Sequence, residues 1–261
     1  MIAGHLRMNV MTAALLAVLA AGGYATGACA QTPAAPAPAP APDYAADLAT
    51  PPRSEADLQA DKRRDPVPFL EFAGLRPGMK VLDMAAGAGY STELVARAVA
   101  PGGVVYGQNP PDLGEKAKAA FEARLQTPVM KGVIAVSRPY EDPVPEHVHG
   151  LDAITFLFFY HDTAYMAVDR GLMDRRLFAV LKPGGFLIIA DHSALPGQGL
   201  SVVKTLHRIE ESTLREEIES VGFKFVAEGN FWRSAADTHD FVTYKPVVPV
   251  DNFVLKFQKP Q

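Results

Sequence analysis

The sequence contains little cysteine and no block of one charge. Its 261 residues include one cysteine, Cys29, so the chain cannot form a disulfide within itself. Lys and Arg number 25 against 29 Asp and Glu, which gives a net charge of −4 without a basic run. Proteins that bind nucleic acid through its phosphates carry a basic face, so the charge argues against a nucleic-acid partner. A composition of 48% hydrophobic and 21% charged residues is typical of a globular domain.

A membrane-spanning helix needs about 20 consecutive apolar residues, and the sequence has no apolar run of that length. The N-terminal run, VMTAALLAVLAA over residues 10–21, has 12 residues. Arg7 precedes this run, and an A-x-A motif at residues 28–30 follows it. The pattern predicts a secretory signal peptide over residues 1–30, cleaved before Gln31. We therefore expect a protein in the periplasm or otherwise outside the inner membrane, with no transmembrane span after cleavage.

Two other interpretations of the N-terminus stay open, namely an uncleaved anchor and a lipoprotein acylated at Cys29. The lipoprotein is disfavoured because Thr26 stands where a large aliphatic residue is usual. The following segment, TPAAPAPAPAP over residues 32–42, alternates proline with alanine, which favours an extended spacer. The sequence thus predicts three parts, listed by range: signal peptide 1–30, Ala/Pro-rich linker 31–53, and one domain 54–261.

Within that domain, strand-like and helix-like segments alternate along the chain. The expected strands cover residues 79–84, 104–108, 133–136, 153–160, 186–190, 223–227 and 253–257. Helix-like segments lie at residues 91–100, 113–125, 166–181 and 214–221. This alternation predicts an α/β fold with a doubly wound, mainly parallel sheet. No helix separates the last two strands, so we expect them to pair antiparallel, and the strand at 153–160, apolar on both faces, to be central.

The turn after the first expected strand carries the first functional signal. The stretch VLDMAAGAGY, residues 81–90, is an apolar strand that ends in small residues and passes into a helix. Gly87 and Gly89 allow the backbone to approach an anionic ligand at the helix N-terminus. A dinucleotide-binding turn has the pattern G-x-G-x-x-G, whose third glycine is absent here because Thr92 occupies that position.

The wider pattern resembles a known family. Residues 81–89, VLDMAAGAG, are similar to the first motif of class I S-adenosylmethionine-dependent methyltransferases, an apolar strand followed by D-x-G-x-G-x-G. Three further motifs occur in the same order as in that family: RPG at 76–78, LKPGG at 181–185 and VGF at 221–223. LKPGG is the most specific of these motifs, because dehydrogenases do not usually carry it. More narrowly, the chain looks like a group of exported bacterial methyltransferase-like proteins, over about residues 65–261.

The resemblance implies a Rossmann-like, mainly parallel seven-stranded sheet with an antiparallel last strand, and S-adenosylmethionine as cofactor. Carried over by position, Asp83, Ala85, Gly87 and Gly89 line the amino-acid end of the cofactor. Asn109 stands where the family usually places an acidic residue that accepts hydrogen bonds from both ribose hydroxyls. An amide offers one acceptor oxygen and no charge, so Asn109 is expected to weaken cofactor binding by on the order of 1 kcal/mol.

Polar residues follow the two central strands. His161 and Asp162 come after the fourth strand, and Asp191 and His192 after the fifth, so all four are candidate catalytic residues. We favour His161 as a general base oriented by an aspartate, with no metal. A divalent metal is the alternative, as in the metal-dependent O-methyltransferases of the family, which have oxygen ligands on the same strand ends. Histidines shift the preference from magnesium toward zinc or another transition metal. Helix capping by Asp162 and a turn at Asp191 also stay open, and His207 precedes the last helix near the same edge.

Three functions are therefore compatible with the sequence. A methyltransferase that acts on a small-molecule or unknown acceptor is favoured. A non-catalytic ligand-binding module on the same fold and an enzyme of another class, such as a metal-dependent one, are the alternatives. The sequence carries no sign of the acceptor or of the oligomeric state.

Overall fold

The computed structural model describes residues 42–261, so the predicted signal peptide and residues 31–41 of the predicted linker lie outside the described residues. The strands are β1 (Lys80–Met84), β2 (Val104–Asn109), β3 (Val133–Ser137), β4 (Leu151–Leu157), β5 (Leu181–His192), β6 (Lys224–Gly229) and β7 (Asn252–Gln258). The helices are α1 (Tyr44–Ala49), α2 (Glu55–Arg64), α3 (Pro66–Ala73), α4 (Tyr90–Val99), α5 (Glu115–Leu125), α6 (Arg170–Val180), α7 (Val203–Leu206) and α8 (Glu211–Ser220), with 3-10 turns η1 (Pro128–Gly132) and η2 (Tyr160–Ala164). Among residues 42–261, no helix combines the length and the apolar composition needed to cross a bilayer.

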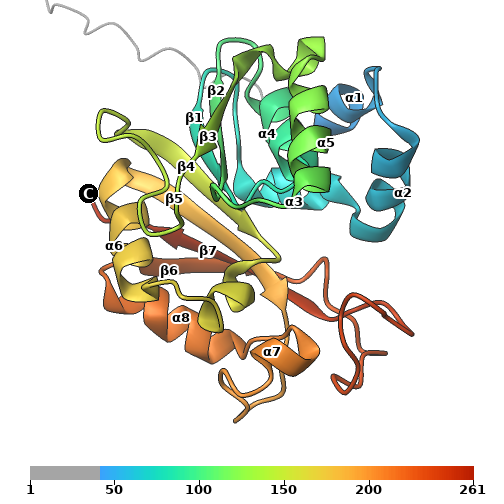
Figure 1. The fold of residues 1–261 in the computed structure, drawn as a ribbon, viewed down its shortest axis with the longest axis vertical. Coiled ribbons are helices and arrows are strands. Elements are labelled where there is room, and N and C mark those ends of the chain that lie inside the picture. Colours follow the sequence, from blue (N-terminus) through green and yellow to red (C-terminus); the bar gives the residue numbers. More distant parts are fainter. Residues whose placement is uncertain (1–41) are drawn as a thin grey trace, which may run out of the picture. The chain divides into compact units, whose positions relative to one another are not determined.

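The strands form one seven-stranded sheet in the order β3-β2-β1-β4-β5-β7-β6 (Figure 1). β1 pairs in parallel with β2 and β4, and β4 pairs in parallel with β5. The last strand, β7, inserts between β5 and β6 and is antiparallel to both. The predicted fold class, a doubly wound and mainly parallel sheet with an antiparallel last strand, is thereby confirmed, as is the central position of β4.

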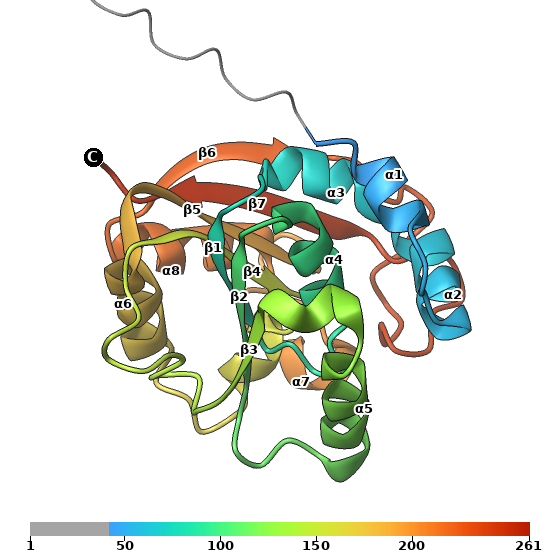
Figure 2. The same cartoon turned by 90° about the horizontal axis from the view of Figure 1, so that it is seen from above.

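Different helices cover the two faces of the sheet, because successive strand residues point to opposite faces. Val81 and Val105 pack in a core with residues of α1, α3 and α4. Leu82 and Met84 point the other way, into a core with residues of α6 and α8. Figure 2 shows the same division, with α3 and α4 on one side of the strands and α6 on the other. The sheet is thus buried on both faces. In such sheets ligands bind beyond the carboxyl ends of the parallel strands, and we refer to this end of the sheet as its carboxyl edge.

The folded domain begins earlier than the predicted boundary at residue 54. Tyr44 of α1 is buried, and its hydroxyl donates a hydrogen bond to the Leu75 carbonyl at 2.5 Å. The Arg97 guanidinium of α4 donates to the carbonyls of Thr50 at 2.7 Å and Pro52 at 2.8 Å. Residues 42–53, expected as part of the linker, are therefore folded onto the domain. Composition did not reveal this, because the contacts come from segments far along the chain.

Strand ends next to the polar residues also differ from the expectation. β4 ends at Leu157, because Phe158 has a left-handed φ of 59° that turns the chain out of the sheet. β5 is longer than expected: it begins at Leu181, which pairs with Leu151, and it includes His192 as its last residue. The LKPGG motif is therefore the start of the strand. The turn at Phe158 places η2 directly over the carboxyl end of β5.

Candidate active site

The turn between β1 and α4, residues 85–89, lies at the carboxyl edge of the sheet. Its backbone is left-handed at Ala85, Gly87 and Gly89, with φ of 52°, 57° and 87°. Gln108, near the end of β2, fixes the turn by accepting hydrogen bonds from the N–H of Ala85 at 3.0 Å and of Ala86 at 2.8 Å. The turn therefore presents a rigid backbone at the N-terminus of α4, where peptide N–H groups and the helix dipole favour anionic groups.

The two glycines of this turn have different surroundings. A Cβ atom on Gly89 would lie 2.6 Å from Cδ2 of Phe121, so this position needs glycine for packing as well as for its backbone angle. A Cβ on Gly87 would meet only the Ala85 carbonyl oxygen within 4 Å, at 3.9 Å. Gly87 is therefore the glycine whose missing side chain leaves room for a ligand.

Asp83 lies beneath the turn and does not face a ligand. Its carboxylate is fully buried and accepts hydrogen bonds from the hydroxyls of Ser91 at 2.8 Å, Thr92 at 2.7 Å and Thr155 at 2.7 Å. Burial raises the pKa of Asp83, and the three hydroxyls oppose this rise. The expectation that Asp83 lines the amino-acid end of the cofactor is therefore corrected: Asp83 links β1, β4 and α4 and holds the turn from below.

Asn109 is also engaged by the turn. Its Oδ1 accepts a hydrogen bond from the Gly87 N–H at 2.7 Å, and its Nδ2 donates to the Gly87 carbonyl at 3.1 Å. A carboxylate lacks the donor for the second bond, so the amide has a role here that an acidic residue cannot fill. The sequence analysis treated Asn109 as a weakened ribose ligand, whereas the structure shows a two-bond clasp on the turn.

A pocket lies beyond the carboxyl ends of β2 and β3. Its walls are mainly apolar and include Asn109, Pro110, Leu113, Phe121, Leu125 and Val136. A pocket of this kind, at the carboxyl ends of parallel strands, suits a planar heterocycle with few polar contacts. Two of its lining residues, Asn109 and Phe121, also lie next to the turn.

The second feature of this edge is a polar cluster, which we define as His161, Asp162, Asp191 and His207. Asp191 is fully buried at its centre and accepts hydrogen bonds from the backbone N–H groups of His161 and His192, both at 2.8 Å. The same carboxylate lies 2.7 Å from Nδ1 of His161. The ring of His161 is therefore fixed, and its Nε2 is the nitrogen left to face the other members of the cluster.

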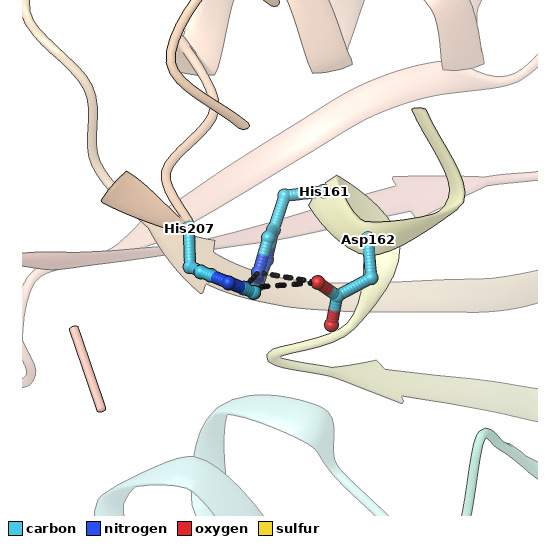
Figure 3. A group of neighbouring side chains, drawn as sticks. All are labelled: His161, Asp162 and His207. Carbon is cyan, nitrogen blue, oxygen red and sulfur yellow. Dashed lines mark hydrogen bonds and ion pairs between the residues drawn. The ribbon is translucent and has the colours of Figure 1, made fainter. Parts of the chain in front are cut away.

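Nε2 of His161 faces Asp162 and His207, as Figure 3 shows. It lies 3.2 Å from Oδ1 of Asp162 and 3.4 Å from Nδ1 of His207. Nδ1 of His207 lies 3.1 Å from the same Asp162 oxygen. The three atoms lie within 4.8 Å of one another, close enough to hold one metal ion. Within residues 42–261, this is the one such group formed by three or more His, Cys, Asp or Glu residues. Asp162 also accepts a hydrogen bond from the Tyr165 hydroxyl, so it does not act as a helix cap.

The position of His207 is set by its neighbour in sequence. His207 ends α7 with a left-handed φ of 53°. Arg208 is fully buried, and its guanidinium donates to the Asp237 carboxylate at 2.9 and 3.1 Å and to the Ser193 carbonyl at 3.0 Å. This buried pair anchors the chain immediately after His207.

Two carboxylates control the charge of His161. Burial opposes a charged ring, but Asp191 and Asp162 outweigh it and raise the pKa of His161 to about 10. Burial also acts against ionisation of Asp162, yet the hydrogen bond from His161 holds the pKa of Asp162 below its ordinary range. A protonated imidazole has no lone pair with which to accept a proton. In this state His161 does not fit the role of general base that the sequence analysis favoured.

His192 is less engaged in the cluster than the sequence analysis expected. Its Nδ1 lies 2.6 Å from Oδ1 of Asn252, and its ring stacks on Phe158 with centroids 5.1 Å apart. Burial lowers the pKa of His192 to about 4, so the ring is neutral at pH 7. His161, Asp162 and Asp191 are thus brought together, whereas His192 lies beside them with its ring centroid 5.6 Å from that of His161.

Arg64, at the end of α2, lies between Tyr90, the first residue of α4, and Phe158, which follows β4. Its guanidinium lies 5.5 Å from the ring centroid of Tyr90 and 4.6 Å from that of Phe158. Burial lowers the pKa of Arg64 from its high ordinary value, and the arginine stays charged, as arginines in proteins do. Among residues 42–261, no carboxylate forms an ion pair with it. The sequence analysis missed this cation, which belongs to no motif, and it noted His207 only for its place before the last helix.

Comparisons with known proteins agree with this geometry. Residues 67–136 match the protein-L-isoaspartate(D-aspartate) O-methyltransferase family. The ubiquinone/menaquinone biosynthesis C-methyltransferase UbiE of Shewanella sediminis is 30% identical over 124 residues, which are 48% of this chain and 47% of that protein. UbiE of Shewanella halifaxensis is 25% identical over 185 residues, 60% of this chain and 71% of that protein. The chain thus spans about half the length of the first of these relatives.

Solved structures share the fold. A SAM-dependent methyltransferase from Aquifex aeolicus superposes with a TM-score of 0.54 and 19% identity, covering 77% of this chain and 96% of that one. At this identity the likeness concerns the fold, while the family match over residues 67–136 includes the glycine turn with β1 and β2. The family match over residues 67–136, the sequence relatives and the shared fold together support the class I S-adenosylmethionine-dependent methyltransferase superfamily as the group that this chain resembles.

Proposed function

We propose that the protein binds S-adenosylmethionine at the turn of residues 85–89 and transfers its methyl group to an acceptor held beside the polar cluster. The observation that supports this most is Gly87, whose missing side chain leaves open space above a turn that Asp83, Gln108 and Asn109 hold rigid. S-adenosylmethionine supplies an electrophilic methyl group, so the protein has mainly to position the acceptor in line with it.

Each part of the cofactor has a matching surface. The apolar pocket beside Phe121 suits the adenine ring, and the backbone at Gly87 suits the amino-acid part. Arg64, held between Tyr90 and Phe158, offers a cation for the carboxylate, since guanidinium binds carboxylates with strong, charge-assisted hydrogen bonds. The polar cluster lies at the ends of the neighbouring strands, where an acceptor would meet the methyl group.

Titration calorimetry of the full-length chain with S-adenosylmethionine and with S-adenosylhomocysteine tests the binding step. We expect saturable binding of both ligands. The Arg64→Ala variant should bind at least about tenfold more weakly, because one charge-assisted hydrogen bond contributes roughly 1.5–3 kcal/mol. Arg63→Ala is the matched control, since Arg63 is the preceding residue of α2 and is exposed. Equal affinities in the two variants would remove Arg64 from the proposal, and no binding to the wild type would overturn it.

We also propose that the protein acts outside the inner membrane. This proposal rests on the signal-peptide pattern of residues 1–30, with Arg7, the apolar run 10–21 and the A-x-A motif 28–30. Intact mass spectrometry of protein from fractionated native cells tests it. We expect a chain that begins at Gln31 in the periplasmic fraction. A chain with Met1 intact in the soluble cytoplasmic fraction would contradict the proposal.

A further inference from the structure

We infer that the polar cluster is a metal site, in which Nε2 of His161, Oδ1 of Asp162 and Nδ1 of His207 bind a divalent transition metal such as zinc. The donor set comes from two segments, η2 and the end of α7, that are 45 residues apart in sequence. It differs from an all-oxygen set on the strand ends, because the carboxylate at the end of β5, Asp191, supports a histidine and is not itself a ligand.

The spacing of the three atoms fits one metal ion. They lie 3.1, 3.2 and 3.4 Å from one another. A zinc ion with nitrogen and oxygen ligands at about 2.0–2.1 Å in tetrahedral geometry requires its ligand atoms to be about 3.3–3.4 Å apart. The three atoms therefore form one face of a coordination tetrahedron without any movement of the backbone.

The surroundings of His161 orient it for metal binding. A metal-binding histidine commonly donates its second ring N–H to a carboxylate, which fixes the ring and the tautomer. Asp191 provides this carboxylate at 2.7 Å from Nδ1, and two backbone N–H groups hold it in place. Nε2 of His161 points at the other two donors (Figure 3), and a bound metal ion displaces the proton that this nitrogen carries in the metal-free protein.

The chemistry of the donors selects the class of metal. Two imidazole nitrogens and one carboxylate oxygen favour zinc and neighbouring transition metals over magnesium or calcium, which prefer oxygen alone. Three protein ligands leave the fourth position of a zinc ion open, as in catalytic zinc sites. The side chains of His207 and Asp162 are 26% and 15% exposed, so solvent and small ligands can reach that position.

Metal binding can be measured without S-adenosylmethionine, so its outcome is independent of the methyl-transfer proposal. The full-length chain is stripped with a chelator and then titrated with Zn²⁺ in competition with a chromophoric chelator. We expect one equivalent to bind. Titration with Co²⁺ should give the intense visible bands of a tetrahedral site, which a loosely bound surface ion with six oxygen ligands does not give.

Variants distinguish ligands from bystanders. His207→Ala removes a ligand and Asp162→Asn removes the negative charge of another, both at partly exposed side chains. Each should lower Zn²⁺ affinity by more than the about 10–100-fold expected of Asp191→Asn, the supporting residue. His192→Ala is the matched control, because this neighbouring histidine directs its Nδ1 at Asn252 and should keep the affinity of the wild type. Circular dichroism of the metal-free variants confirms folding before each titration.

Two results would overturn the inference. One is a wild type that shows no saturable Zn²⁺ or Co²⁺ binding. The other is unchanged Zn²⁺ affinity in folded His207→Ala and Asp162→Asn, which would place the metal elsewhere. Loss of the tetrahedral Co²⁺ bands in these two variants but not in His192→Ala supports the assigned ligands.

Discussion

The turn at residues 85–89 and the polar cluster lie at the same edge of the sheet but are built differently. The turn is one short stretch of chain, and its function depends on backbone angles and on small side chains. The cluster joins η2, the end of β5 and the end of α7, and it depends on charged side chains in contact. The residues that form the turn are thus contiguous, although Gln108 and Asn109 of β2 hold them in place, whereas the cluster exists only when the whole domain has folded.

This difference predicts a strong response to pH on the cluster side. Asp174 of α6 supports that side, because its carboxylate accepts a hydrogen bond at 2.9 Å from the hydroxyl of Tyr160, the residue before His161. Burial raises the pKa of Asp174 to about 7, with Glu217 adding to the rise and Tyr160 opposing it. Its other oxygen has no hydrogen-bond partner among the described residues, which also favours the protonated acid.

The largest expected effect is therefore a loss of stability as the pH rises. The folded pKa of Asp174, about 7, exceeds the unfolded value of 3.8, so the folded state binds the proton more tightly. The free energy of unfolding then falls between about pH 4 and pH 7 and levels off above. Asp174→Asn should remove this fall, which amounts to on the order of 4 kcal/mol. Urea unfolding of both proteins from pH 4 to pH 8 measures it, and parallel curves would contradict the prediction.

On the side of the turn, packing gives the largest effect. Gly89→Ala places a methyl group 2.6 Å from Phe121 and imposes a left-handed φ of 87° on alanine. We expect a loss of about 3 kcal/mol in the free energy of unfolding from overpacking and backbone strain together. Gly87→Ala is the matched control, with a left-handed φ but open space, and should lose only about 1–2 kcal/mol. Its S-adenosylmethionine affinity should fall, however, because the new methyl group enters the ligand space. Equal losses of stability in the two variants would contradict the distinction between the glycines.

Each region contains a buried aspartate, so the same substitution can be compared in both. Asp191 in the cluster accepts hydrogen bonds from two backbone N–H groups, which can only donate. Asp191→Asn turns one of its acceptors into a donor, so the metal-free protein should lose about 2 kcal/mol. Asp83 under the turn has hydroxyl partners, which can accept as well as donate, so Asp83→Asn should cost less than about 1 kcal/mol. Urea unfolding at pH 8 measures both, and a reversed order would contradict this account.

The smallest effect concerns the alanine in the glycine motif. Ala85 has a φ of 52°, a conformation that costs an L-residue roughly 1–2 kcal/mol. Glycine relieves this strain but loses more entropy on folding, so Ala85→Gly should stabilise the protein by only about 0.5 kcal/mol. The midpoint of urea unfolding should rise slightly with an unchanged slope. A decrease would show that the methyl group of Ala85 makes a packing contact worth more than the strain.

Sequence reasoning was most successful where the signal is contiguous. The turn, the central position of the fourth strand and the antiparallel closing pair follow from local patterns of apolar residues and glycines, and the structure confirms them. The clasp of Asn109 on Gly87 was not predictable, because it depends on the side-chain angles of one amide. The contribution of His207 was suggested only by its place before α8, since nothing local in the sequence fixes its contact with Asp162. α1 was missed because buried contacts from α4 hold it in place.

The buried pair of Arg208 and Asp237 has a consequence for chain-length variation. The loop before α7 contains Gly197 and Gly199, both with positive φ, and several exposed residues, so an insertion there leaves Arg208 in its place. An insertion between His207 and Arg208 instead displaces the imidazole by up to about 3.8 Å, the distance between successive Cα atoms, and separates it from Asp162. Homologues with a longer loop before α7 can therefore keep the donor atoms of His161, Asp162 and His207 together. Homologues with an extra residue directly after His207 are expected to lose the His207 donor.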